Sequence, residues 1–213
     1  MKRFKDLEVI IGSDSQAIEE LVKIKEKCNS YYFTFSVDVE KLYQQNDRML
    51  HIIANVPKTP EAILLVFANG GNIKVINIVP RKSGGDGLTK EQYNKIVDFF
   101  NNTVLQPLMG NRYRIIVTSD TVKMEDIIPK SYLPLVRFVE STSIESPFSH
   151  PLDREKWYEF VCKLNSNNEY LSSGDLRQWL LEDMGRDDKL VDIIIDKYED
   201  ATELLEYYDR NYN

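Results

Sequence analysis

The chain has 213 residues, 42% of them hydrophobic and 29% charged, and its formal net charge is −7 at pH 7. Enough apolar residues are present to bury a core, so the composition excludes wholesale disorder. No window approaches the roughly 20 apolar residues of a membrane-spanning helix, so a membrane is not an expected partner. Residues 151–213 carry a net charge of −8 and residues 1–150 a net charge of +1, which argues against a general nucleic-acid binder because phosphate contacts need clustered Lys and Arg.

The first third of the sequence predicts a strand, a helix and a second strand. Residues 7–11 are typical of a short strand, and the helix that follows over 13–27 begins at Ser13, with Gln16 placed to complete a capping box. In an extended chain, residues 30–37 place two sets of side chains on opposite faces. One face carries Tyr31, Phe33, Phe35 and Val37, and the other carries Tyr32, Thr34 and Ser36. That alternation indicates a half-buried strand.

The middle of the sequence predicts an antiparallel meander. After residues 38–47, which are polar and fit either a short helix or a long turn, come β-rich runs at 49–56, 61–68 and 73–79. The last two runs are joined by Asn-Gly-Gly-Asn at 69–72, and Gly and Asn tolerate the positive φ that tight hairpin turns require. Three strands with short connections favour antiparallel pairing.

A glycine-rich loop at 83–87 precedes the second predicted helix. Its position between a strand and a helix would suit a phosphate-binding loop, but its spacing matches neither the dinucleotide nor the Walker A pattern. Thr89 and Gln92 form a second candidate capping box. The apolar residues then recur at three- and four-residue steps until Pro107 and Gly110, which we expect to end the helix.

One more strand, at 112–118, completes the pattern of an α+β domain over residues 1–140. The order of elements predicts a twisted, mainly antiparallel sheet with helices packed on it. Residues 131–140 fit a short helix interrupted by Pro134, and the polar segment 141–147 is the expected domain boundary.

Residues 148–213 are predicted to form an acidic, all-helical region of three helices. Pro151 fits the first turn of one helix, Ser172 or Ser173 caps the next, and Asp187 starts the last and longest. Helices with such short loops pack antiparallel. We expect this region to pack against the first domain, because it has more apolar surface than three helices can bury among themselves.

The two cysteines and the N-terminus favour a reduced intracellular setting. Cys28 and Cys162 lie far apart in predicted helices, and we expect inert thiols, although a disulfide stays possible in principle. The basic first residues are followed by Asp6 and Glu8 without an apolar segment, so no secretory signal is predicted. The expected localisation is therefore cytoplasmic.

Four residues are candidates for catalysis. His150 at a helix start could act as a general base oriented by Asp153, and Asp14 and Asp120 follow strand ends, where a pair of carboxylates could hold Mg²⁺. The alternative is that Ser149 caps the helix and that the aspartates serve capping and turn formation. No His-x-x-x-His or Cys-x-x-Cys occurs, so we expect no metal-binding residues and no cofactor.

Five residues are candidates for binding a partner. Arg154 and Trp157 could form a surface contact on the first helix of the acidic region, while Tyr198, Tyr207 and Tyr208 lie among many acids on the last one. Such an acidic and aromatic face could dock a basic protein, or it could be the solvated side of an amphipathic helix.

The leading hypothesis is a non-enzymatic protein-interaction module in the cytoplasm, with an immunity, antitoxin or regulatory-inhibitor role. Its segregated acidic charge, its aromatic residues and the lack of a catalytic motif motivate this hypothesis. The expected partner is another protein, of basic character, and homo-oligomerisation is left open. The alternative is an enzyme, a metal-dependent hydrolase or nuclease, whose candidate residues would have to converge in one cleft.

Overall fold

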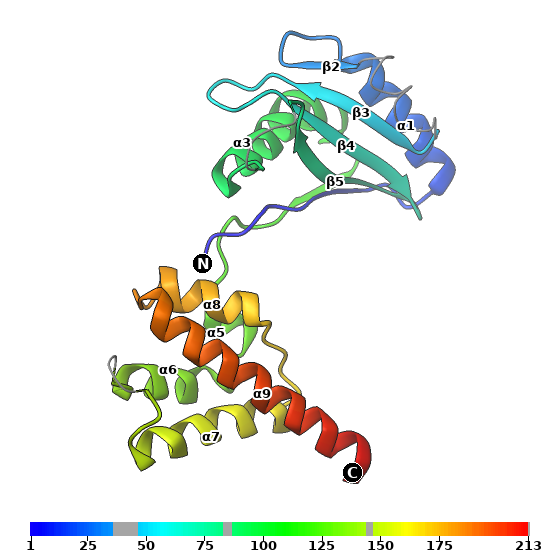
Figure 1. Cartoon of the computed structure of the whole chain (residues 1–213). Coiled ribbons are helices and arrows are strands. Elements are labelled where there is room, and N and C mark those ends of the chain that lie inside the picture. The colour runs from blue at the N-terminus through cyan, green and yellow to red at the C-terminus, as the bar shows by residue number, and fades with distance from the viewer. Residues whose placement is uncertain (36–46, 83–86, 144–146, 213) are drawn as a thin grey trace. The chain divides into compact units, whose positions relative to one another are not determined.

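The chain folds into two compact units (Figure 1). The sheet unit comprises Lys2–Asp120, and the helical unit comprises Met1 and Thr121–Asn213. The division falls earlier than the segment 141–147, because the helices that precede that segment share a core with the later ones. The computed structural model describes residues 1–35, 47–82, 87–143 and 147–212.

Among the described residues, six strands form one antiparallel sheet in the order β2-β3-β4-β5-β1-β6, and this confirms the predicted α+β class. Between the strands lie the helices α1, α3 and α4 and one π-helical segment, η1. The elements of the sheet unit are β1 (Leu7–Ile10), α1 (Asp14–Lys27), β2 (Phe33–Phe35), β3 (Met49–Ala54), β4 (Ala62–Asn69), β5 (Asn72–Pro80), α3 (Lys90–Phe100), η1 (Asn101–Leu105), α4 (Gln106–Met109) and β6 (Arg114–Val117).

The predicted meander is confirmed in β3, β4 and β5. The β4–β5 turn consists of Gly70 and Gly71, whose φ angles are 58° and 81°, as a two-residue hairpin turn of the type I′ class requires. Gly71 is needed for a second reason. A Cβ atom there would lie 2.9 Å from the backbone carbon of Gly12, so the turn approaches the segment after β1 too closely for any side chain.

Strand β1 occupies an interior position between β5 and β6, which the sequence pattern did not indicate. Leu7 lies opposite Val75 on one side and opposite Val117 on the other, and both pairings are antiparallel. The sheet is therefore completed by residues that are far apart in the sequence, and β2 and β6 form its edges.

Helices α1 and α3 pack on one face of the sheet. Alternate strand residues point toward them, so Ile52 and Leu64 are fully buried with Ile24 of α1 and Phe100 of α3. This is the main core of the unit. Burial of this kind also raises the pKa of the Cys28 thiol to about 12, which suits the inert thiol that was expected there.

One buried charge ties α1 to the segment before β6. The Glu20 carboxylate, only 3% exposed, accepts hydrogen bonds from Arg112 at 2.9 and 3.0 Å and from Lys23 at 2.8 Å. The hydroxyl of Tyr113 also donates to it, at 3.2 Å. Four donated hydrogen bonds satisfy the carboxylate, as a charge in a core requires.

The helix termini agree with the prediction in part. Thr89 and Gln92 form the predicted capping box at the start of α3. Ser13 occupies the N-cap position of α1, but its side chain makes no capping hydrogen bond, and its hydroxyl contacts that of Ser15 at 3.1 Å instead. The capping box predicted at Ser13 and Gln16 is therefore wrong.

The second long helix continues past Pro107 and ends at the other predicted residue, since Gly110 is its C-cap. Pro107 lies in the first turn of α4, where its missing N–H is tolerated, and the helix ends at Met109. The change from α3 to α4 passes through η1, in which the N–H of Gln106 donates to the carbonyl oxygen of Asn101. Such π-helical segments are typical of places where the regular hydrogen-bond pattern is disturbed.

Three other expectations concern segments of the sheet unit that are described only in part. The strand predicted over 30–37 is described as β2 from Phe33 to Phe35, and Tyr31, which lies before β2, is 83% exposed. The predicted helix or turn at 38–47 lies outside the described residues except for Asp47. The glycine-rich loop lies outside them except for Gly87, so its phosphate-loop alternative stays a prediction.

The helical unit contains the three predicted helices and two earlier ones. α6 packs against α7, and α9 packs against both α7 and α8. Pro134 lies in the first turn of α6 and does not interrupt it. None of the helices in the described part of the chain is long and apolar enough to cross a membrane. The helices of the unit are α5 (Met124–Ile127), α6 (Tyr132–Ser141), α7 (Pro151–Ser166), α8 (Ser173–Glu182) and α9 (Asp188–Tyr212).

Candidate functional site

The register of the sheet separates the two aspartates that were considered as a magnesium pair. Asp14 follows the end of β1, and Asp120 follows the end of β6. Because these neighbouring strands are antiparallel, with Leu7 opposite Val117, their C-terminal ends point in opposite directions and lie at opposite ends of the strand pair. The two carboxylates do not converge, and the paired-carboxylate site is wrong.

Asp14 instead stabilises the sheet unit. Its carboxylate accepts two hydrogen bonds of 2.7 Å from the Arg48 guanidinium and one of 3.1 Å from the N–H of Gly70. The hydrogen bonds from Arg48 lower the pKa of Asp14. The side chain therefore joins the start of α1 to the loop before β3 and to the hairpin turn.

His150 caps α7. Its Nδ1 atom accepts a hydrogen bond of 3.2 Å from the N–H of Leu152, so histidine takes the position that was expected for Ser149. A neutral imidazole that accepts at Nδ1 carries its proton on Nε2, so neither ring nitrogen is free to accept a proton while this cap is formed. Asp153, in the first turn of α7, is 7% exposed, and its N–H donates to the carbonyl oxygen of His150 at 3.1 Å. These contacts stabilise a helix terminus. Within the described residues, no group of three or more His, Cys, Asp or Glu is arranged to hold a metal ion.

Two of the five residues proposed to bind a partner belong to the core of the helical unit. Trp157 and Tyr198 are each 3% exposed, and the ring of Trp157 lies 5.0 Å from that of Phe138. The hydroxyl of Tyr198 donates to the carbonyl oxygen of Leu171 at 2.6 Å, and burial raises the pKa of that hydroxyl. Neither ring is available to a partner. Arg154 is exposed on α7, and its role as a surface contact stays a prediction.

Four exposed apolar residues lie close together on the last turns of α9. Tyr207 and Tyr208 are 54% and 51% exposed, Leu204 is 68% exposed and Tyr212 is 69% exposed. We call these four residues the α9 stripe. The rings of Tyr208 and Tyr212 stack with their centroids 5.6 Å apart, and Figure 1 shows this end of α9 extending beyond the other helices of the unit.

Two residues of the α9 stripe, Tyr208 and Tyr212, continue the buried face of the same helix. Tyr198 and Leu205, which pack in the core, are followed at three- and four-residue steps by Tyr208 and Tyr212. The helix therefore keeps an apolar face after its neighbours end. Beside the stripe, residues 199–212 hold five acidic side chains and one basic side chain, a net charge of −4.

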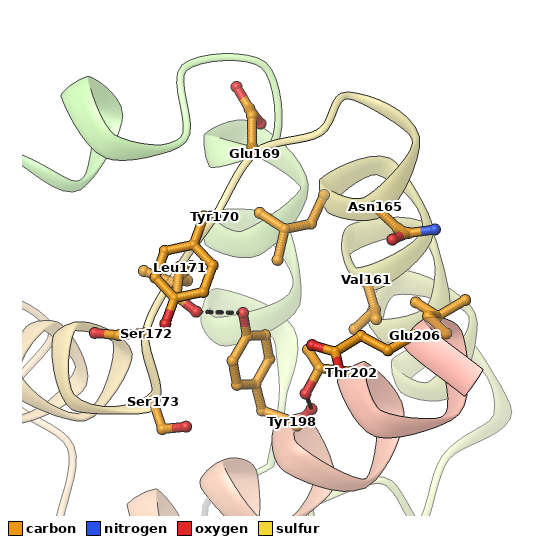
Figure 2. A pocket seen from close by; sticks show the side chains of 12 residues that line it. Val161, Asn165, Glu169, Tyr170, Leu171, Ser172, Ser173, Tyr198, Thr202 and Glu206 are labelled. Carbon is orange, nitrogen blue, oxygen red and sulfur yellow. Dashed lines mark hydrogen bonds between the residues drawn. The ribbon is translucent and has the colours of Figure 1, made fainter. Parts of the chain in front are cut away.

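A cleft of about 260 Å³ lies next to the α9 stripe, between α7, α9 and the loop 167–172 (Figure 2). Its apolar lining includes Val161 and Leu205, and its polar lining includes Asn165. The side-chain amide of Asn165 donates to the Asp209 carboxylate at 3.0 Å, which holds α7 and α9 together at the end of the cleft.

Sequence reasoning missed the aromatic rim of this cleft. Tyr170 is 81% exposed and lies in the loop between α7 and α8, where no periodic pattern marks it. Leu204 was missed as well, although it lies four residues before Tyr208 and therefore on the same side of the helix. Comparison with protein-family models, with curated proteins and with solved structures found nothing that matches this chain.

Proposed function

We propose that the chain is a non-enzymatic interaction module that docks a basic protein on the α9 stripe. The observation that carries this proposal is the apolar face of α9, which continues through Leu204, Tyr208 and Tyr212 beyond the core. Tyrosine is enriched at protein interfaces because its ring is apolar and its hydroxyl forms hydrogen bonds. An immunity, antitoxin or regulatory-inhibitor role would use such a surface.

Charge favours a basic partner over a second copy of the chain. Two α9 stripes packed together would bring two segments of net charge −4 into contact, and like charges across an interface oppose association. A basic surface would gain from the same charges, most strongly at low ionic strength. Metal-dependent hydrolysis has less support, since His150 caps a helix and Asp14 forms an ion pair with Arg48.

Replacing Leu204 and Tyr208 together by serine is expected to weaken the complex about 30-fold or more, because each residue would be a central apolar anchor. The measurement is native mass spectrometry of the protein isolated from its source cells after nuclease treatment. We expect a stoichiometric basic polypeptide with the wild-type protein, and its loss with Leu204→Ser/Tyr208→Ser and at high salt.

The matched control is Leu152→Ser/Tyr158→Ser on α7, whose side chains are 54% and 60% exposed. This variant removes the same two residue types from the same unit, and we expect it to retain the partner. Loss of the partner in the α7 variant alone would place docking near Arg154 and overturn the α9 proposal. A monomer or a homo-oligomer in the wild-type sample would overturn the interaction with a basic protein.

A further inference from the structure

The cleft beside the α9 stripe has the size of a site for one side chain. Its volume of about 260 Å³ is below the range of roughly 300–1,000 Å³ that is typical of pockets for whole cofactors or drug-sized ligands. It opens on the same end of α9 that carries the stripe, because Leu205 and Glu206 line it while Leu204 and Tyr207 belong to the stripe. A partner seated on the stripe would therefore reach the cleft.

The charged residues that line the cleft are acidic. Glu169 and Glu206 line it, and none of the described residues that line it is Lys or Arg. Glu169 is already satisfied, since its two carboxylate oxygens accept hydrogen bonds of 2.9 and 3.0 Å from the N–H groups of Lys130 and Ser131. Glu206 is therefore the carboxylate that could receive a cation.

Glu206 has only a weak cationic neighbour in the protein. The Arg210 guanidinium is 4.0 Å from its carboxylate, and both side chains are more than 70% exposed. Exposed pairs at that distance contribute little, so a cation bound in the cleft could replace Arg210 at small cost.

The exposed ring of Tyr170 also lines the cleft. Figure 2 shows Tyr170 and Glu206 on either side of the Tyr198 ring. The Tyr198 hydroxyl is occupied by Leu171, and the Thr202 hydroxyl donates to the backbone, so these groups do not compete for a ligand. The exposed ring of Tyr170 is free to stack on a flat cation.

We propose that this cleft receives an arginine side chain of the basic partner, with its guanidinium stacked on Tyr170 and paired with Glu206. Arginine fits better than lysine, because a guanidinium is planar, stacks on aromatic faces and is more weakly hydrated than an ammonium group. This inference rests on the proposed function and deepens it, since it names the residue that the interaction module recognises.

The experiment compares hexa-arginine with hexa-lysine as probes of the full chain, by calorimetric titration at low salt. We expect hexa-arginine to bind about tenfold more tightly than hexa-lysine, with shifts in the ring signals of Tyr170 in nuclear magnetic resonance spectra. Both Glu206→Gln and Tyr170→Leu should remove most of that preference.

Glu203→Gln is the matched control, because Glu203 is an exposed acid on the same helix that does not line the cleft. We expect it to change hexa-arginine affinity less than about twofold, as for an isolated screened surface charge. Equal losses in Glu203→Gln and Glu206→Gln, or equal affinity for the two peptides, would overturn the arginine site. Docking on the α9 stripe is tested separately with the copurified partner, so it would survive that outcome.

Discussion

Replacing Trp157 by alanine is expected to lower the free energy of unfolding of the helical unit by about 3–5 kcal/mol, the usual cost of removing a buried tryptophan. The ring contacts Phe138 at 5.0 Å, Phe148 at 5.4 Å and Phe160 at 5.6 Å between centroids, so its loss leaves a cavity lined by rings that cannot all collapse into it. If Trp157 were a surface contact residue, the same change would affect binding and leave stability intact.

Tryptophan fluorescence measures the unfolding of the helical unit separately from that of the sheet unit. Trp157 and Trp179 are the two tryptophans of the chain, both in the helical unit, so Trp179 still reports its unfolding in urea when Trp157 is replaced. The neighbouring Tyr158 is 60% exposed, and Tyr158→Ala should change the free energy of unfolding by less than about 0.5 kcal/mol. Similar midpoints for the two variants would contradict the burial of Trp157.

Replacing Glu20 by glutamine is expected to destabilise the sheet unit by about 2 kcal/mol at pH 7, because hydrogen bonds to a charged group are lost while the volume is conserved. The effect stays below that of breaking a fully buried ion pair, since the Arg112 side chain is 45% exposed and can be hydrated. Hydrogen exchange of the α1 amides would measure the change. Glu19→Gln, an exposed acid on the same helix, is the control.

The effect of Glu20 should depend on pH. Burial alone would raise the pKa of Glu20, but the hydrogen bonds from Lys23 and Arg112 outweigh burial and lower it below its ordinary value. The ionised carboxylate therefore stabilises the folded state fully above the pKa of the unfolded chain. This stabilisation is lost as the pH falls through the lower pKa of the folded state. The difference between the wild-type protein and Glu20→Gln should shrink toward pH 3, and a constant difference would contradict the ion-pair origin.

Local patterns predicted the local parts of the fold. The β4–β5 hairpin followed from Asn-Gly-Gly-Asn between two β-rich runs, and the start of α3 from Thr89 and Gln92, because turn and cap chemistry depends on neighbours in the sequence. The interior position of β1 and the division at Asp120 did not follow. Both depend on which distant segments share a core, and periodicity contains no information on that.

The lack of information on tertiary packing also explains why two of the candidate binding residues proved to be buried. Helical spacing placed Trp157 and Tyr198 on apolar faces, but it could not show that α6 and the loop before α8 cover them. It also could not separate Tyr198 from Tyr208, which lie on one face of α9 and differ only in whether another element reaches them. Burial of a shared face is decided by tertiary packing.

The interior position of β1 has a consequence for the order of folding events. The strands β3, β4 and β5 are joined by short loops and can pair early, since little loop-closure entropy is lost. β1 finds its two neighbours only after the chain has closed the loops to residues 72–75 and 114–117. Until then β5 presents an open edge and the helix-facing side of the meander is incomplete. We therefore expect the pairing of β1 to be the slow step of folding in this unit, and aggregation to compete most strongly before it.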